Sequence, residues 1–272
     1  MADINLNGLG VALVTPFHED QTIDFGSLEK IIEYTIEEGC NYIVVLGTTA
    51  ETPTLSQSEK REIASFVRNK NNGRLPLVLG LGGNCTRKVI EDFQNFDLEG
   101  YSAILSVTPY YNKPSQEGLF EHFRLIADNS PLPVILYNVP GRTGVNLSAE
   151  TTVKLANYSD IIQGIKEASG NISQCEEIKA KSPSDFKLIS GDDSLTAQIM
   201  KLGGSGVISV LANAMPSLMK KIVTSCEQKK YDDALEIQKK INPLISYLFR
   251  DGNPAGVKAL LSKMGLCKNI LR

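Results

Sequence analysis

The sequence predicts an α/β fold, a (β/α)8 TIM barrel with three additional C-terminal helices. Short apolar segments alternate with longer amphipathic segments, and this alternation recurs eight times. Alternating strands and helices with right-handed crossovers form a parallel sheet that is covered on both faces. Eight such units close into a barrel, and 272 residues suit a barrel of ~250 residues with a helical addition.

The eight expected strands are short apolar runs bounded by turn residues. They span residues 10–15, 42–47, 77–80, 102–107, 133–137, 161–166, 187–190 and 206–210.

The segments between the strands carry apolar residues at helical spacing. One such face runs from Leu28 to Ile36 and is closed by Gly39, a typical residue after a helix end. Ser56 and Glu59 are spaced as a capping box that opens the next helix. Further apolar faces are expected over residues 119–127 and 195–202.

Three more helical patterns follow the last strand, over residues 216–230, 231–249 and 254–264. No linker or low-complexity tract interrupts the chain. We therefore expect a single domain over residues 1–272, with the barrel in 1–214 and a helical extension in 215–272 packed on it.

Composition and charge exclude several classes of function. The net charge of −3 and the absence of a basic block argue against nucleic-acid binding. No apolar run approaches the ~20 residues that cross a bilayer, and residues 1–7 lack the features of a signal peptide. Five scattered cysteines without CxxC spacing are typical of reduced core thiols, so we expect a cytoplasmic protein.

The chain has only two histidines, His18 and His122, and they lie far apart in the sequence. Zinc hydrolases and metal-dependent aldolases need a cluster of ligands that this pattern does not supply. We expect no metal and no cofactor. If the protein acts on a carbonyl compound, an amine is the better candidate for the reactive group.

Lys166 lies near the carboxyl end of the sixth expected strand, in an otherwise apolar run. Burying an ammonium group costs several kcal/mol unless it is paired or loses its proton. A neutral amine is a nucleophile that can form a Schiff base with a carbonyl substrate. The alternative is a lysine that reaches solvent or pairs with Glu167.

Other polar residues follow the strands, where the active sites of barrels of this type lie. They include hydroxyls after strand two (Thr48, Thr49), phenols after strands four and five (Tyr110, Tyr111, Tyr137), Arg142, and two carboxylates after strand seven (Asp192, Asp193). Each has a structural alternative: turn hydroxyls, packed tyrosines, a surface cation, a helix N-cap. Together they suit the condensation of a 2-oxo acid with a second carbonyl compound.

Three segments, residues 47–51 (GTTAE), 137–143 (YNVPGRT) and 164–168 (GIKEA), resemble the dihydrodipicolinate synthase / N-acetylneuraminate lyase family. The resemblance runs from about Gly8 to the C-terminus. It includes residues 108–112, 116–118, 190–193, 206–209 and the pair Asn253-Pro254.

The resemblance implies a Schiff-base condensation of pyruvate with L-aspartate 4-semialdehyde to 4-hydroxy-tetrahydrodipicolinate, the first committed step of diaminopimelate and lysine biosynthesis. Lys166 would form the imine, Tyr137 would donate and accept protons, and Thr48 and Tyr111 would relay them. The resemblance implies binding roles for four further residues: Thr49 and the backbone of Ile208 for the pyruvate carboxylate, Arg142 for the semialdehyde carboxylate, and Gly191 beside the pyruvate pocket. It also implies a homo-oligomer, a tetramer built as a dimer of dimers, in which Tyr111 reaches the partner's site.

Two features depart from the family's usual pattern. Many members bind L-lysine in a regulatory pocket at a subunit interface. The corresponding positions here are Asn84, Tyr110, Gln57, Lys60 and Lys88, with two lysines where a histidine and a glutamate are usual. These cations should repel the ammonium groups of L-lysine, so we expect weak or absent inhibition. The chain also ends at Arg272, about one helix earlier than usual, which bears on the tetramer and leaves the barrel unaffected.

Two alternatives stay open on the sequence alone. The first is a lyase of the same family that acts on N-acetylneuraminate or a 2-keto-3-deoxy sugar acid; Arg142 argues against the former. The second is a barrel that binds 2-oxo acids without catalysis. Such a barrel would form no adduct with pyruvate under borohydride.

Overall fold

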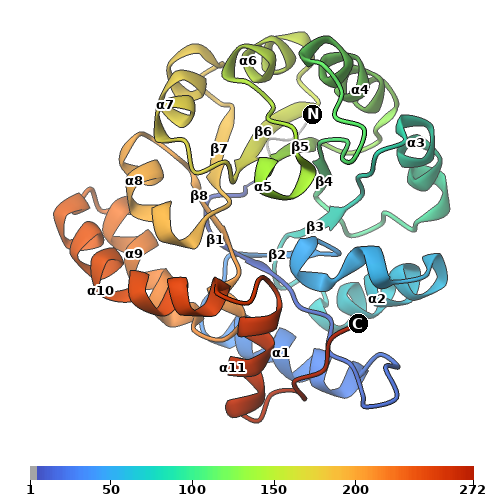
Figure 1. Ribbon diagram of the computed structural model, residues 1–272, viewed down its shortest axis with the longest axis vertical. Helices are drawn as coiled ribbons and strands as arrows, with labels where there is room; N and C mark the ends of the chain where they lie inside the picture. Colours follow the sequence, from blue (N-terminus) through green and yellow to red (C-terminus); the bar gives the residue numbers. More distant parts are fainter. Residues whose placement is uncertain (1–4) are drawn as a thin grey trace.

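The computed structural model describes residues 5–272, in which eight parallel strands pair in sequential order and close as β8 pairs with β1. Figure 1 looks along this barrel and shows the helices arranged around the strands. The strands are β1 (Gly8–Ala12), β2 (Tyr42–Val45), β3 (Leu77–Gly80), β4 (Ala103–Val107), β5 (Val134–Asn138), β6 (Ile162–Glu167), β7 (Lys187–Ser190) and β8 (Gly206–Ser209). The barrel predicted from the sequence is confirmed. We expected no signal peptide in residues 1–7. Residues 1–4 of that segment lie outside the described residues.

The first strand shows the largest difference from prediction, because it ends at Ala12 where pairing was expected to continue to residue 15. A side chain replaces the strand ladder at this point. Asn213 accepts a hydrogen bond from the backbone N–H of Val14 at 3.0 Å and donates one to the carbonyl of Ala12 at 2.8 Å.

The helices of the connections are α1 (Phe25–Glu37), α2 (Gln57–Asn71), α3 (Thr86–Asn95), α4 (Gln116–Asn129), α5 (Pro140–Thr143), α6 (Ala149–Tyr158), α7 (Ile172–Lys181) and α8 (Thr196–Lys201). The predicted capping box of α2 is present: Ser56 accepts from the N–H of Glu59, and the Glu59 carboxylate accepts from the N–H of Ser56. Gly39 follows α1 with a φ of 93°, a conformation that glycine adopts without strain.

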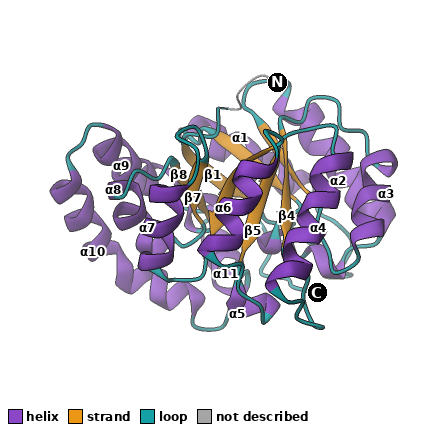
Figure 2. Ribbon diagram, turned by 90° about the horizontal axis from the view of Figure 1, so that it is seen from above, coloured by secondary structure: helices purple, strands orange, loops and turns teal. Residues whose placement is uncertain are grey.

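Three helices follow β8, as predicted: α9 (Pro216–Glu227), α10 (Tyr231–Phe249) and α11 (Ala255–Lys263). The first of them, α9, packs on β1 and β8 and so completes the outer ring, whereas α10 packs on α8 and α9. Figure 2 shows α5 and α11 at the same end of the barrel. The predicted boundary between the barrel and its helical extension, at residues 214 and 215, stays a prediction. Within the predicted extension, α9 packs on strands of the barrel.

Apolar side chains fill both faces of the sheet. One cluster lies inside the barrel and includes Ala12, Val44, Leu105, Tyr137 and Ile208. A larger cluster lies between the strands and the helices. Parallel strands covered on both faces read as continuous apolar runs, which is why the strands could be found in the sequence. In the described part of the chain, no helix is long and apolar enough to cross a membrane.

Candidate active site

Lys166 lies on the inner face of β6 and is 4% exposed. It pairs in register with Tyr137 of β5, and its Nζ lies 4.4 Å from the centroid of the Tyr137 ring. Within residues 5–272, no carboxylate forms an ion pair with Lys166. The structural alternative, a strand-end lysine that reaches solvent or pairs with Glu167, is therefore wrong.

Glu167 points to the opposite face because successive side chains of a strand alternate. Its carboxylate is buried and accepts hydrogen bonds from three groups: the amide of Asn138 at 3.0 Å, the amide of Gln174 at 2.9 Å and the backbone N–H of Ser169 at 2.7 Å. This network fixes the strand end behind Lys166 and leaves the inner face to the lysine and the tyrosine.

Thr48 and Thr49 lie in a single 3-10 turn, η1 (Thr48–Ala50), directly after β2. Thr49 is 1% exposed, and its Oγ1 accepts a hydrogen bond from Nδ2 of Asn253 at 3.0 Å. The hydroxyl that bonds the turn backbone is that of Thr52, which donates to the carbonyl of Gly47 at 2.8 Å. For Thr49, whose hydroxyl contacts the side chain of Asn253, the turn-hydroxyl interpretation is therefore wrong.

Arg142 comes from α5, the short helix that follows β5. Its Nη2 donates to the backbone carbonyl of Asn253 at 3.1 Å, and the side chain is otherwise accessible. Asn253 therefore contacts both Thr49 and Arg142. No role could be assigned to this asparagine from the sequence, because its partners lie more than a hundred positions away.

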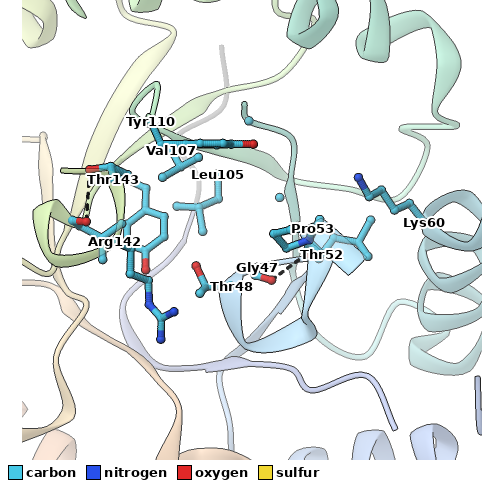
Figure 3. A pocket seen from close by; sticks show the side chains of 15 residues that line it. Gly47, Thr48, Thr52, Pro53, Lys60, Leu105, Val107, Tyr110, Arg142 and Thr143 are labelled. Carbon is cyan, nitrogen blue, oxygen red and sulfur yellow. Dashed lines mark hydrogen bonds between the residues drawn. The ribbon is translucent and has the colours of Figure 1, made fainter. Parts of the chain in front are cut away.

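A cavity of about 290 Å³ opens between the loops that follow β2, β3, β4 and β5. Thr48, Tyr137 and Arg142 line it together, and Lys60 and Tyr110 complete its wall. Figure 3 shows Arg142 and Lys60 on opposite sides of this cavity. Its lining residues include two cations and no carboxylate, so the cavity favours anionic ligands.

Neither Ile208 nor Gly191 lines the cavity, and Gly191 lies beside Lys166. Ile208 is buried inside the barrel in β8. A Cβ on Gly191 would lie 3.0 Å from Cγ of Lys166 and 2.8 Å from Cβ of Ala168, so only glycine fits beside the lysine.

The two carboxylates after β7 have different partners. Asp192 is an N-cap, as the structural alternative predicted, and accepts from the N–H of Ser194 at 2.8 Å. Asp193 instead accepts from the N–H groups of Val210 and Leu211, at 3.0 and 2.8 Å. Burial raises the pKa of Asp193. Its carboxylate ties the loop after β7 to the loop after β8.

Tyr111 does not line the cavity that holds Thr48 and Tyr137. It is 85% exposed and adopts a φ of 77°, which is uncommon outside glycine. One chain therefore brings together only two of the three groups of the predicted proton relay.

Only some residues of the predicted regulatory pocket line the cavity. Lys60 and Tyr110 line the cavity, and Nδ2 of Asn84 lies 3.5 Å from the carbonyl of Tyr110. Gln57 on α2 and Lys88 on α3 are exposed. Burial lowers the pKa of Lys60.

Comparisons with known proteins agree with this geometry. A model of the dihydrodipicolinate synthetase family matches residues 5–272. The 4-hydroxy-tetrahydrodipicolinate synthase of Parabacteroides distasonis is 52% identical over 272 residues, which cover 100% of this chain and 92% of that protein. The dihydrodipicolinate synthase structure from Thermotoga maritima is 38% identical with a TM-score of 0.96, over 99% of this chain and 92% of that one. A chloride-inhibited dihydrodipicolinate synthase from Acinetobacter baumannii, complexed with pyruvate, is 42% identical with a TM-score of 0.94, over 98% and 91% of the chains.

Proposed function

This chain belongs to the dihydrodipicolinate synthetase family, and we propose that it condenses pyruvate with L-aspartate 4-semialdehyde to give 4-hydroxy-tetrahydrodipicolinate. The observation that carries the proposal is Lys166, a buried lysine inside the barrel that has no carboxylate partner within residues 5–272 and packs on Tyr137. Such an amine is suited to Schiff-base chemistry because it lies beside a phenol and a cavity, where a carbonyl substrate can reach it.

The reaction begins when the neutral Nζ of Lys166 attacks the keto carbon of pyruvate. A C–N bond forms, water leaves, and the resulting imine loses a methyl proton to become an enamine. The hydroxyl of Thr49 and the backbone at Ile208 bind the pyruvate carboxylate, and Gly191 leaves room beside the lysine stem. The cavity with Thr48 and Tyr137 in its wall receives the second substrate.

The enamine carbon then attacks the aldehyde carbon, and the aldehyde oxygen takes a proton to become the hydroxyl of the product. The amine of the semialdehyde attacks the imine carbon, which closes the ring and breaks the bond to Lys166. Tyr137 donates and accepts these protons, with Thr48 and Tyr111 as its relay to solvent. A phenol is a weak acid by itself, so a chain of hydroxyls shares the transfer.

Arg142 binds the carboxylate of the semialdehyde. A guanidinium group can donate two parallel hydrogen bonds to a carboxylate, which fixes both its position and its orientation. The contact of Arg142 with the carbonyl of Asn253 supports this role, since it holds the side chain at the cavity.

The active form is a homo-oligomer, a tetramer built as a dimer of dimers, in which Tyr111 completes the site of a partner subunit. Its 85% exposure and its left-handed backbone support this proposal, because an exposed aromatic side chain on a strained backbone is typical of a group held for a partner.

Intact mass after borohydride treatment with pyruvate tests the chemistry. The parent chain should gain a pyruvate-sized adduct, and Lys166→Ala should gain none. Lys201→Ala is the matched control, because Lys201 is exposed on α8 and should leave the adduct unchanged. A parent chain without an adduct would contradict the proposal. Turnover of a sugar aldehyde in preference to the semialdehyde would instead identify a sugar-acid lyase.

A further inference from the structure

Asn253 lies in the loop between α10 and α11 and contacts both side chains to which we assign substrate carboxylates. Its Nδ2 donates to Oγ1 of Thr49 at 3.0 Å. Its backbone carbonyl accepts from Nη2 of Arg142 at 3.1 Å. One residue from the segment after the outer ring thus links the loop that follows β2 to the loop that follows β5.

The direction of the first hydrogen bond matters for binding. A threonine hydroxyl has one hydrogen to donate and lone pairs with which to accept. Because Oγ1 of Thr49 accepts from Asn253, its hydrogen remains available. The Thr49 hydroxyl donates to no group among the described residues, although Thr49 is only 1% exposed.

We propose that Asn253 is a positioning residue that turns the Thr49 hydroxyl so that its hydrogen points to the carboxylate of the 2-oxo acid. The same residue holds Arg142 through its backbone carbonyl. The inference rests on the proposed function, because it assumes that Thr49 binds the carboxylate of pyruvate.

A buried ion pair keeps this loop and the threonine turn in register. Lys258 of α11 is entirely buried and donates to the carboxylate of Glu51, the residue that ends the turn. Glu51 adopts a φ of 56°, which residues other than glycine hold only when their surroundings fix them. The α11 segment therefore contacts the turn twice, at Thr49 through Asn253 and at Glu51 through Lys258.

The variant Asn253→Asp tests the direction of the hydrogen bond. It keeps the shape of the side chain and the backbone carbonyl, but it replaces the donor by a negatively charged acceptor. The Thr49 hydroxyl then donates to the new carboxylate and is lost to the substrate. We expect the pyruvate concentration for half-maximal reductive trapping with cyanoborohydride to rise at least about tenfold, the usual effect of losing a hydrogen bond to a charged group.

Three further readouts separate positioning from a general structural role. The KM for the semialdehyde should stay within about twofold, because the carbonyl that holds Arg142 is retained. Lowering the pH should bring pyruvate half-saturation back toward the parent value, because a protonated carboxyl can donate to Thr49 again. Asn242→Asp places the same charge on α10 away from the cavity and should change neither constant.

A double-mutant cycle provides the second test, with thermal unfolding to verify that each variant folds. Asn253→Ala should weaken pyruvate trapping several-fold in the parent but by less than about twofold when added to Thr49→Val, since its effect passes through the hydroxyl. The positioning role of Asn253 would be overturned if Asn253→Ala had equal effects in the parent and in Thr49→Val, or if Asn253→Asp left the half-saturating pyruvate concentration unchanged. Either result would leave the proposed function intact. A parent chain that traps no pyruvate would overturn the proposed function and this inference with it.

Discussion

The two buried lysines of the described chain, Lys166 in β6 and Lys258 in α11, differ in what faces their ammonium groups. Both lie over an aromatic ring, with Nζ 4.4 Å from the Tyr137 centroid and 4.1 Å from the Phe17 centroid respectively. Lys258 donates to the carboxylate of Glu51 and, at 2.9 Å, to the carbonyl of Ile270. Within residues 5–272, Lys166 has no carboxylate partner and lies beside a cavity.

This difference separates a lysine that holds the fold from one that is available for chemistry. Burial lowers the pKa of Lys258, while the hydrogen bond and the charge of Glu51 oppose that change. A buried ammonium with satisfied hydrogen bonds is a structural element. A buried amine with no anionic partner at a cavity is a candidate nucleophile. Burial alone does not distinguish the two.

Lys166→Met should have the largest effect on activity and little effect on stability. The change removes the amine that forms the imine, so we expect kcat to fall at least about 10,000-fold, as when a covalent nucleophile is lost. The apolar side chain fills the same buried space, so the unfolding free energy should stay the same or rise. Steady-state kinetics and denaturant unfolding measure the two quantities. A stability loss as large as that of the next variant would remove the distinction between the two lysines.

Lys258→Met should do the reverse and destabilise the fold by about 3–5 kcal/mol, because it leaves the Glu51 carboxylate buried and unpaired. Denaturant unfolding gives the value. Adding Glu51→Gln should restore part of the loss, since the neutral amide needs no counter-charge. If the double variant is no more stable than Lys258→Met, the ion pair does not account for the destabilisation.

The sequence predicted Lys166 and missed Lys258, for a physical reason. Lys166 interrupts an apolar run in a strand, where a charge is conspicuous because both faces of a parallel strand are covered. Lys258 lies in an amphipathic helix, where a lysine normally faces solvent, and its partner Glu51 is 207 positions away.

The same distinction between local patterns and distant contacts applies to the other features of the site. The barrel, the capping box and the polar residues after the strands depend on local patterns, and all of these were predicted. The contacts of Asn253 with Thr49 and of Asp193 with the N–H groups after β8 depend on distant segments that only the closed barrel brings together.

His122 extends the comparison to a third buried basic group, which has a neutral partner. Its Nδ1 lies 2.8 Å from Oγ1 of Thr86, and burial lowers its pKa from 6.5 to about 4. The unfolded chain therefore binds a proton below pH ~6.5 and the folded chain only below pH ~4. The unfolding free energy should fall as the pH is lowered through this window, by up to about 3 kcal/mol from this group.

The measurement is urea unfolding between pH 7 and 4 for the parent and for His122→Gln. The difference between the two curves isolates the histidine from the carboxylates that titrate in the same range. The variant should lose less stability than the parent across the window. Parallel curves would mean that His122 accepts its proton in the folded state as easily as in the unfolded chain.

Lys60 is a half-buried cation in the cavity wall, and it has no ion-pair partner in the described part of the chain. Among these variants, changing it should have the smallest effect. It should disfavour any ligand with an ammonium group nearby, and Lys88 is a second cation on α3. We expect L-lysine at about 1 mM to leave the rate nearly unchanged. Lys60→His combined with Lys88→Glu should lower the half-inhibitory concentration by roughly tenfold, at ~0.5–1 kcal/mol for each altered charge. Lys201→Glu on α8 controls for net charge. Inhibition of the parent by submillimolar L-lysine would show that these cations do not face the ligand. The comparison would then apply to the buried lysines and not to the half-buried Lys60.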